Sequence, residues 1–212
     1  MAQEGGLHDE LVDLPVTASE VVFDGAVWDV RRDTFELEGQ TLVREVVDHP
    51  GAVAVLALDE DERALLIRQY RHPVSAHEWE IPAGLLDVTG EDPLVGAQRE
   101  LLEEADVTAD EWWVLVDYFT SPGGMNEAIR IYLARGLHEV PEGDRHERDG
   151  EEAHIEYRRV GLDEVADAVL AGQVHNSTLI VAALAARAAR EGGWVSLRPA
   201  DSPWPEHPAR RG

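Results

Sequence analysis

Cysteine and lysine are both absent from this chain of 212 residues. Without cysteine there is no disulfide framework, no thiolate zinc site and no cysteine nucleophile, a composition typical of the cytoplasm. Residues 1–15 lack the basic and apolar regions of a signal peptide. No later segment approaches the ~18 uninterrupted apolar residues of a membrane-spanning helix. We therefore expect a cytoplasmic protein that is neither secreted nor anchored by a span.

Positive charge is scarce. The chain carries 43 acidic residues against 18 basic ones, and its formal net charge is -25. A surface of this sign repels phosphate backbones and anionic lipid head groups, so we expect no nucleic-acid partner and no membrane partner. An acidic protein that acts on an anionic substrate needs a local source of positive charge. A divalent metal held by clustered carboxylates, helped by a few arginines, would be such a source.

With 44% hydrophobic and 29% charged residues, the composition is that of a globular domain. Polar and apolar residues alternate over residues 20–47, which predicts antiparallel strands. Residues 51–58 (GAVAVLAL) form a near-continuous apolar run, which predicts a buried strand. The acidic cluster at 59–62 predicts a turn, and residues 64–70 predict the returning strand of a hairpin.

The clearest helix signal lies at Asp92 and Pro93, an N-cap followed by a residue whose φ suits the first turn. They predict a helix over residues 93–105. A strand is expected at 78–82, before this helix. After the helix we expect strands at 112–120, 128–134 and 156–160, and then helices at 162–171 and 177–190. This order indicates an α+β fold with a mixed sheet. From residue 198 on, the chain is rich in proline, and we expect it to be mobile.

Three glutamates share one face of the helix predicted at 93–105. Glu100, Glu103 and Glu104 stand at i, i+3 and i+4, so their carboxylates lie one turn apart. Their repulsion disfavours the helix by about 0.2–0.5 kcal/mol per pair unless a cation binds. Oxygen ligands favour Mg²⁺ or Mn²⁺ over zinc. Arg99 lies four residues before Glu103 and can hold that carboxylate. The alternative is a solvated acidic face on a surface helix.

The residues around this triple resemble the signature of the Nudix family. That signature runs Gly, five residues, Glu, seven residues, then Arg-Glu-apolar-x-Glu-Glu-x-Gly-apolar. Here six residues separate Gly84 from Glu91, and seven more precede the run RELLEEADV at 99–107. The extra residue lies in a loop, so the helix register is unaffected. Asp106 replaces the last Gly, where a left-handed residue is often needed, and Asp tolerates that conformation at a modest cost in stability.

Further segments resemble the ADP-ribose pyrophosphatase branch of that family, namely DHPGAV at 48–53, RQYR at 68–71, WEIPAG at 79–84 and SPGGMNE at 121–127. The resemblance implies a Nudix-type α/β/α sandwich with a mixed sheet, preceded by an antiparallel N-terminal strand region that swaps between the subunits of a homodimer. It divides the chain into a flexible arm at 1–16, the strand region used in dimerisation at 17–48, a Nudix catalytic domain at 49–195 and a flexible tail at 196–212.

The resemblance also implies Mg²⁺-dependent hydrolysis of the diphosphate of ADP-ribose to AMP and ribose 5-phosphate, with Mn²⁺ as a substitute metal. Two or three ions would be held by Glu100, Glu104, Glu103 and the backbone carbonyl of Ala83. The resemblance also implies that Arg99 and Glu103 take part in catalysis. The attacking water would be oriented by a carboxylate of the loop HERDGEEAHIE, which offers both Glu151 and Glu152; we favour Glu152.

Substrate-binding residues follow from the same resemblance. Arg71 would contact the phosphates through its planar guanidinium, and Arg44 is a weaker candidate for that role. Trp28 would stack on adenine from the partner subunit. For the arginines the alternative is an exposed structural role. For Trp28 it is a position in the core or at an interface.

Glu80 and Glu127 would accept hydrogen bonds from substrate hydroxyl or amino groups, with solvent exposure as the alternative, and Met125 would line the ribose pocket. The histidines show no metal-ligand spacing and are expected on the surface or in loops: His49, His72, His77, His154 and His175.

Two other functions remain open. Another nucleoside diphosphate derivative, such as a nucleotide sugar or NADH, could be the substrate, because pocket shape decides this. A non-catalytic module that senses ADP-ribose is the other alternative. Such modules usually lose the carboxylates of the signature, all of which are present here.

Overall fold

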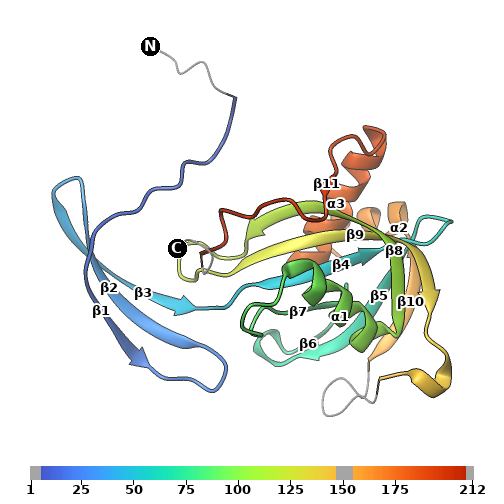
Figure 1. Ribbon diagram of the computed structural model, residues 1–212, viewed down its shortest axis with the longest axis horizontal. Helices are drawn as coiled ribbons and strands as arrows, with labels where there is room; N and C mark the ends of the chain where they lie inside the picture. The colour runs from blue at the N-terminus through green and yellow to red at the C-terminus, as the bar shows by residue number, and fades with distance from the viewer. Residues whose placement is uncertain (1–5, 147–154, 209–212) are drawn as a thin grey trace.

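A computed structural model describes residues 6–146 and 155–208. The first three strands form an antiparallel sheet beside the body of the molecule (Figure 1): β1 (Val16–Phe23), β2 (Asp29–Leu37) and β3 (Gln40–Asp48). Glu38 and Gly39 join β2 to β3 with φ angles of 50° and 77°. Two such residues form a turn whose twist matches the flanking strands. The antiparallel strands expected over 20–47 are confirmed.

A five-stranded sheet forms the centre of the body, in the order β11-β8-β9-β4-β7. Its strands are β4 (Ala52–Ala57), β7 (Ala83–Leu85), β8 (Val107–Phe119), β9 (Ala128–Glu139) and β11 (Arg198–Pro199). β4 runs parallel to β9, whereas the other neighbours are antiparallel. The sheet is therefore mixed, as predicted. β8 and β9 exceed the predicted strands because they pair with each other over nearly their whole lengths.

A second sheet of three antiparallel strands has the order β10-β5-β6, with β10 (Glu156–Gly161), β5 (Arg63–Arg71) and β6 (Ala76–Glu80). Short 3-10 helices lie at η1 (His72–Val74) and η2 (Glu142–Asp144). The hairpin predicted for residues 51–70 is wrong. Its two strands occupy different sheets, joined by one isolated bridge between Leu58 and Ala64. Sequence pattern identified both strands, but long-range pairing decided their partners.

Helices cover both faces of the central sheet (Figure 1): α1 (Pro93–Ala105) on one, α2 (Leu162–Leu170) and α3 (Ser177–Glu191) on the other. Every residue of β4 is buried, and its side chains alternate between two cores. Val53 and Val55 join the core that contains Leu101 of α1, while Ala54 and Leu56 join the core that contains Leu179 of α3. The predicted α/β/α sandwich is confirmed. None of the described helices is long and apolar enough to cross a membrane.

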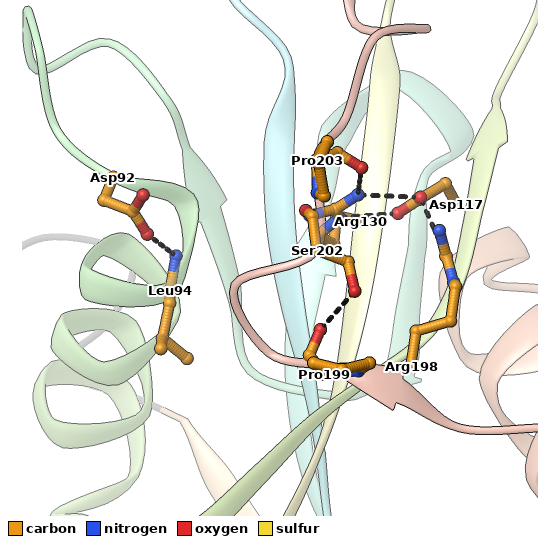
Figure 2. A network of polar contacts seen from close by, with 8 residues as sticks. All are labelled: Asp92, Leu94, Asp117, Arg130, Arg198, Pro199, Ser202 and Pro203. Atoms are coloured by element: carbon orange, nitrogen blue, oxygen red, sulfur yellow. Dashed lines mark hydrogen bonds and ion pairs between the residues drawn. The ribbon is translucent and has the colours of Figure 1, made fainter.

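Helix α1 begins and ends where the sequence predicts. Asp92 accepts a hydrogen bond from the backbone N–H of Leu94 at 2.9 Å (Figure 2), and Pro93 opens the first turn. At the other end Asp106 is left-handed, with φ 51° and ψ 39°, and its N–H bonds to carbonyls of the last turn. Aspartate thus occupies the conformation for which the family signature uses glycine.

Arg130 fastens the C-terminal segment to the central sheet (Figure 2). Its side chain is 2% exposed and donates to both carboxylate oxygens of Asp117, at 2.8 and 2.9 Å. It also donates to the backbone carbonyls of Ser202 and Pro203, at 2.7 and 3.2 Å. Its guanidinium lies 4.7 Å from the ring centroid of Trp204. Although burial opposes its charge, bonding to Asp117 raises the pKa of Arg130, so the charge is retained.

The expected mobile tail is therefore wrong for residues 198–208. Trp204 and His207 are buried, and an added Cβ on Gly51 would lie 2.2 Å from Nε2 of His207. The imidazole thus packs directly on the backbone before β4. Its proline-rich composition led us to expect a mobile segment, but the composition contains no signal for the buried arginine to which the segment binds.

Replacing Arg130 should separate this segment from the sheet. We expect Arg130→Ala to lower the free energy of unfolding by about 3 kcal/mol, because Asp117 loses its buried partner. Urea denaturation measures the change. The control is Arg158→Ala, since Arg158 pairs with Glu164 on the surface with its side chain 58% exposed; its effect should stay within about 1 kcal/mol. Equal losses in the two variants would contradict the assignment.

Candidate active site

Arg99 gathers the acidic residues around α1. Its Nε and Nη2 donate to the two oxygens of Glu91, each at 3.1 Å. Its Nη1 donates to Glu100 and, at 3.0 Å, to Glu103. The i,i+4 contact with Glu103 is the one that the sequence predicts. Hydrogen bonding to Glu91, together with the charge of Glu100 and the hydrogen bonds to Glu103 and Glu100, raises the pKa of Arg99, which keeps it cationic. One guanidinium thus offsets the repulsion among three carboxylates.

Two carboxylates of α1 reach the backbone of β7. Glu104 is 6% exposed, and its Oε2 accepts a hydrogen bond from the N–H of Ala83 at 2.8 Å. A Cβ on Gly84 would lie only 2.0 Å from the carboxyl carbon of Glu100. Glycine at position 84 therefore lets Glu100 approach the strand. Glu104 and Glu100 thus approach two adjacent residues, Ala83 and Gly84, and Ala83 carries the carbonyl predicted to bind metal.

The chemistry of these groups suits a hard divalent cation, because carboxylate and carbonyl oxygens are the ligands that such ions prefer. Among residues 6–146 and 155–208, no three acidic or histidine side chains are already gathered as around an ion. Glu100 and Glu103 instead share Nη1 of Arg99. A cation that binds here would take over part of the charge compensation that Arg99 supplies.

Arg71 and Glu80 form a bidentate ion pair next to α1. Nε and Nη2 of Arg71 donate to the two oxygens of Glu80, at 2.8 and 2.6 Å. The pair raises the pKa of Arg71, and the charge of Glu104 adds to the effect, so this arginine lies near the acidic face of α1. Glu80 is 3% exposed, which excludes the solvent-exposed alternative. Its carboxylate is also committed to Arg71, which the sequence did not predict.

A third group surrounds His49, which lies in the loop between β3 and β4, as expected, but is buried. Trp28 stacks on its imidazole, with ring centroids 4.7 Å apart. On the other side, Nε2 lies 3.2 Å from Oε1 of Glu127, whose second oxygen accepts from the hydroxyl of Thr120 at 2.6 Å. Trp28 therefore lies close to Glu127 of its own chain. Sequence reasoning missed His49 because its spacing matches no catalytic or metal pattern.

The remaining predicted residues are more dispersed. Met125 lies beside Val47 in an isolated bridge. Arg44 is exposed on β3, where it donates to the carbonyl of Val43, so the structure does not join it to the groups above. Glu151 and Glu152 lie outside the described residues.

β4 connects the groups that do assemble. One edge of β4 pairs with β7, which carries Ala83 and Gly84, and the other pairs with β9, which begins directly after Glu127. The acidic face and the Trp28–Glu127 group therefore flank one end of the same strand.

The description "NUDIX domain" belongs to the family model that matches residues 48–180. The chain belongs to the Nudix family. The resemblance drawn from Gly84, Glu91 and the run at 99–107 is thereby confirmed, and the chain is a Nudix hydrolase. Hydrolases of this family generally use a divalent metal, in agreement with the oxygen donors on α1.

Several known proteins are similar to this chain. An "ADP-ribose pyrophosphatase" of Mycobacterium tuberculosis is 42% identical over 92% of this chain and 93% of its own length. A "Methanol dehydrogenase activator" of Bacillus methanolicus is 36% identical over 77% of this chain and 87% of its own. An "ADP-ribose pyrophosphatase" of Bacillus subtilis is 36% identical over 76% of this chain and 85% of its own.

Among solved structures, an "ADP compounds hydrolase" aligns with a TM-score of 0.69 and 23% identity, covering 88% of this chain and 98% of the other. This likeness confirms the fold.

Removing Arg99 should expose the repulsion that it offsets. We expect Arg99→Ala, in chelator, to lower the free energy of unfolding by about 2 kcal/mol, and a divalent cation to restore part of it. Arg187→Ala is the matched control: Arg187 also reaches three acids from a helix, but their side chains are 60–71% exposed. That variant should lose at most about 1 kcal/mol. Denaturant unfolding with and without the cation tests this, and an unchanged Arg99 variant would contradict it.

Proposed function

We propose that this Nudix hydrolase cuts the diphosphate of ADP-ribose to AMP and ribose 5-phosphate, with Mg²⁺ as its metal and Mn²⁺ as a substitute. The observation that carries the proposal is the convergence of Glu100 and Glu104 on Ala83 and Gly84, with Arg71 close by. The printed names of the relatives from Mycobacterium tuberculosis and Bacillus subtilis support the choice of substrate.

The metal-binding residues in this proposal are Glu100, Glu104, Glu103 and the carbonyl of Ala83, which together would hold two or three ions. Bound Mg²⁺ neutralises charge on phosphate oxygens and lowers the pKa of a coordinated water. Arg99 holds Glu103 and Glu100 in place before the metal arrives.

Arg71 binds the diphosphate. Glu80 fixes its Nε and Nη2, and among the described residues Nη1 has no hydrogen-bond partner, so it could bind a phosphate oxygen. This changes the role expected of Glu80 from a direct acceptor of substrate hydrogen bonds to a residue that orients Arg71. Glu127 and Met125 keep their proposed places at the nucleoside side. Trp28 would join them there, but it lies against His49 of its own chain and not of a partner. Arg44 would be a further phosphate contact.

The carboxylate that orients the attacking water is Glu152 or Glu151. The described residues that flank their loop support this assignment. The backbone N–H of His146 donates to Oδ1 of Asp106 at 3.1 Å, and the hydroxyl of Tyr157 donates to the carbonyl of Glu104 at 2.8 Å. Both ends of the loop are thus attached where α1 ends.

The proposed assembly is a cytoplasmic homodimer that exchanges its N-terminal strands. Support comes from the N-terminal sheet, in which every residue of β1 is exposed, including Val21, Val22 and Phe23. Exposed apolar side chains on a sheet favour burial against another surface, and a second copy of this chain presents the same strands. Residues 17–48 would then be the dimerisation region and 49–195 the catalytic domain.

The substrate is tested by incubating the protein with Mg²⁺ and a panel of ADP-ribose, nucleotide sugars and NADH, and identifying products by mass. We expect ADP-ribose to be cut fastest, at the diphosphate, and no turnover in chelator. Faster turnover of a nucleotide sugar or NADH would reassign the substrate. Binding of ADP-ribose without products would make the protein a sensor.

A single substitution tests the metal assignment. We expect Glu104→Gln to reduce turnover by about 100-fold or more, because an amide is a poor Mg²⁺ ligand. Its unfolding in chelator should hardly change, since the amide oxygen can still accept from the N–H of Ala83. Glu60→Gln, in the exposed turn before β5, is the control and should keep normal turnover. Normal turnover in the Glu104 variant would remove this residue from the metal site.

A further inference from the structure

The ring of His49 makes three contacts. Its Nδ1 accepts a hydrogen bond from the backbone N–H of Gly51 at 3.0 Å, and its Nε2 lies 3.2 Å from Glu127. A backbone N–H can only donate, so Nδ1 carries no proton, and Nε2 must carry it and donate to the carboxylate. Trp28 covers one face at an interplanar angle of 27°. The contacts therefore specify a neutral ring with one defined tautomer.

Burial favours the same state. The side chain of His49 is 2% exposed, and desolvation lowers its pKa although Glu127 and Asp48 raise it. A neutral imidazole at neutral pH follows. Protonation of Nδ1 would break the bond from Gly51, so the geometry and the charge state depend on each other.

The backbone around His49 is fixed to the loop that carries Glu127. The N–H of His49 donates to Oδ1 of Asn126 at 2.7 Å, and Nδ2 of Asn126 donates to Asp48 at 2.6 Å. The N–H of Val47 donates to the carbonyl of Gly124 at 2.9 Å. Residues 47–51 and 121–127 thus form one polar unit, and the ring projects from it toward Trp28.

Within the part of the chain that the structure describes, the side chain of Trp28 makes no hydrogen bond. It follows the loop between β1 and β2, is 42% exposed, and lies over His49. Together with Val27, Asp29, Asp48 and Pro50, these two rings line a hollow of about 300 Å³. Placing Trp28 relative to Glu127 therefore depends on the histidine between them.

We propose that His49 is a positioning residue for the nucleoside end of the substrate, holding Trp28 and Glu127 at a fixed separation. This inference rests on the function proposed above. His49 acts through its two neighbours and takes no part in the cleavage step. It should therefore control affinity for the nucleotide more than the rate of bond breaking.

Two substitutions separate the two contacts. His49→Phe keeps a flat ring against Trp28 but removes the donor to Glu127 and the acceptor for Gly51. His49→Gln keeps an amide donor and an acceptor but removes the ring. His175→Gln is the control, because His175 is an exposed loop histidine between α2 and α3.

For each protein, kcat and KM are measured with ADP-ribose, Kd is measured by calorimetry with AMP and with ribose 5-phosphate, and thermal unfolding is recorded. In His49→Phe we expect KM and the Kd of AMP to rise about tenfold, with kcat within about twofold. His49→Gln should recover part of the loss. The Kd of ribose 5-phosphate should be unchanged in both, and the control should match the wild type.

Unchanged KM and AMP affinity in both His49 variants would overturn the inference. So would equal losses for AMP and ribose 5-phosphate that follow the loss of folded protein, because that pattern indicates a purely structural role. Failure of the proposed function is seen separately, as absent turnover of ADP-ribose by the wild type, and AMP affinities still test His49 in that case.

Discussion

The repulsion between carboxylates on one face of α1 is the constraint on which the site depends. Glu100 and Glu103 share Nη1 of Arg99, and Glu104 is held by the N–H of Ala83. Without a metal, these contacts are what permit several like charges to stand one turn apart at the edge of a buried core. These hydrogen bonds offset the repulsion, and a bound divalent cation could replace part of their effect.

β4 holds in place the elements that carry these contacts. Because both faces of β4 are buried, α1 and α3 are fixed to opposite sides of one rigid strand. Because its two edges pair with β7 and β9, the acidic face and the group around His49 meet at the same end. Arg130 secures the C-terminal segment to this frame, and His207 packs on Gly51 directly before the strand. Residues distant in the sequence thereby stabilise β4, the strand that positions both groups.

Local signals predicted much of this structure. Asp92, Pro93 and the left-handed position of Asp106 fix the ends of α1, so its bounds and its acidic face could be read from the sequence. The buried strand at 51–58 followed from its unbroken apolar run.

What could not be predicted depends on tertiary contacts. The partner of β5 is chosen by long-range pairing, and the path of residues 198–208 is set by a buried arginine far away in the sequence. The burial of His49 and the commitment of Glu80 to Arg71 likewise arise only when distant segments meet.

Crystals soaked in Mn²⁺ test whether metal binds between α1 and β7. We expect anomalous density within coordination distance of carboxylate oxygens of Glu100 and Glu104 and of the carbonyl of Ala83, with Arg99 moved away from Glu100. Saturating Mn²⁺ with no density there, or density elsewhere while Arg99 keeps its contacts with Glu100 and Glu103, would contradict it.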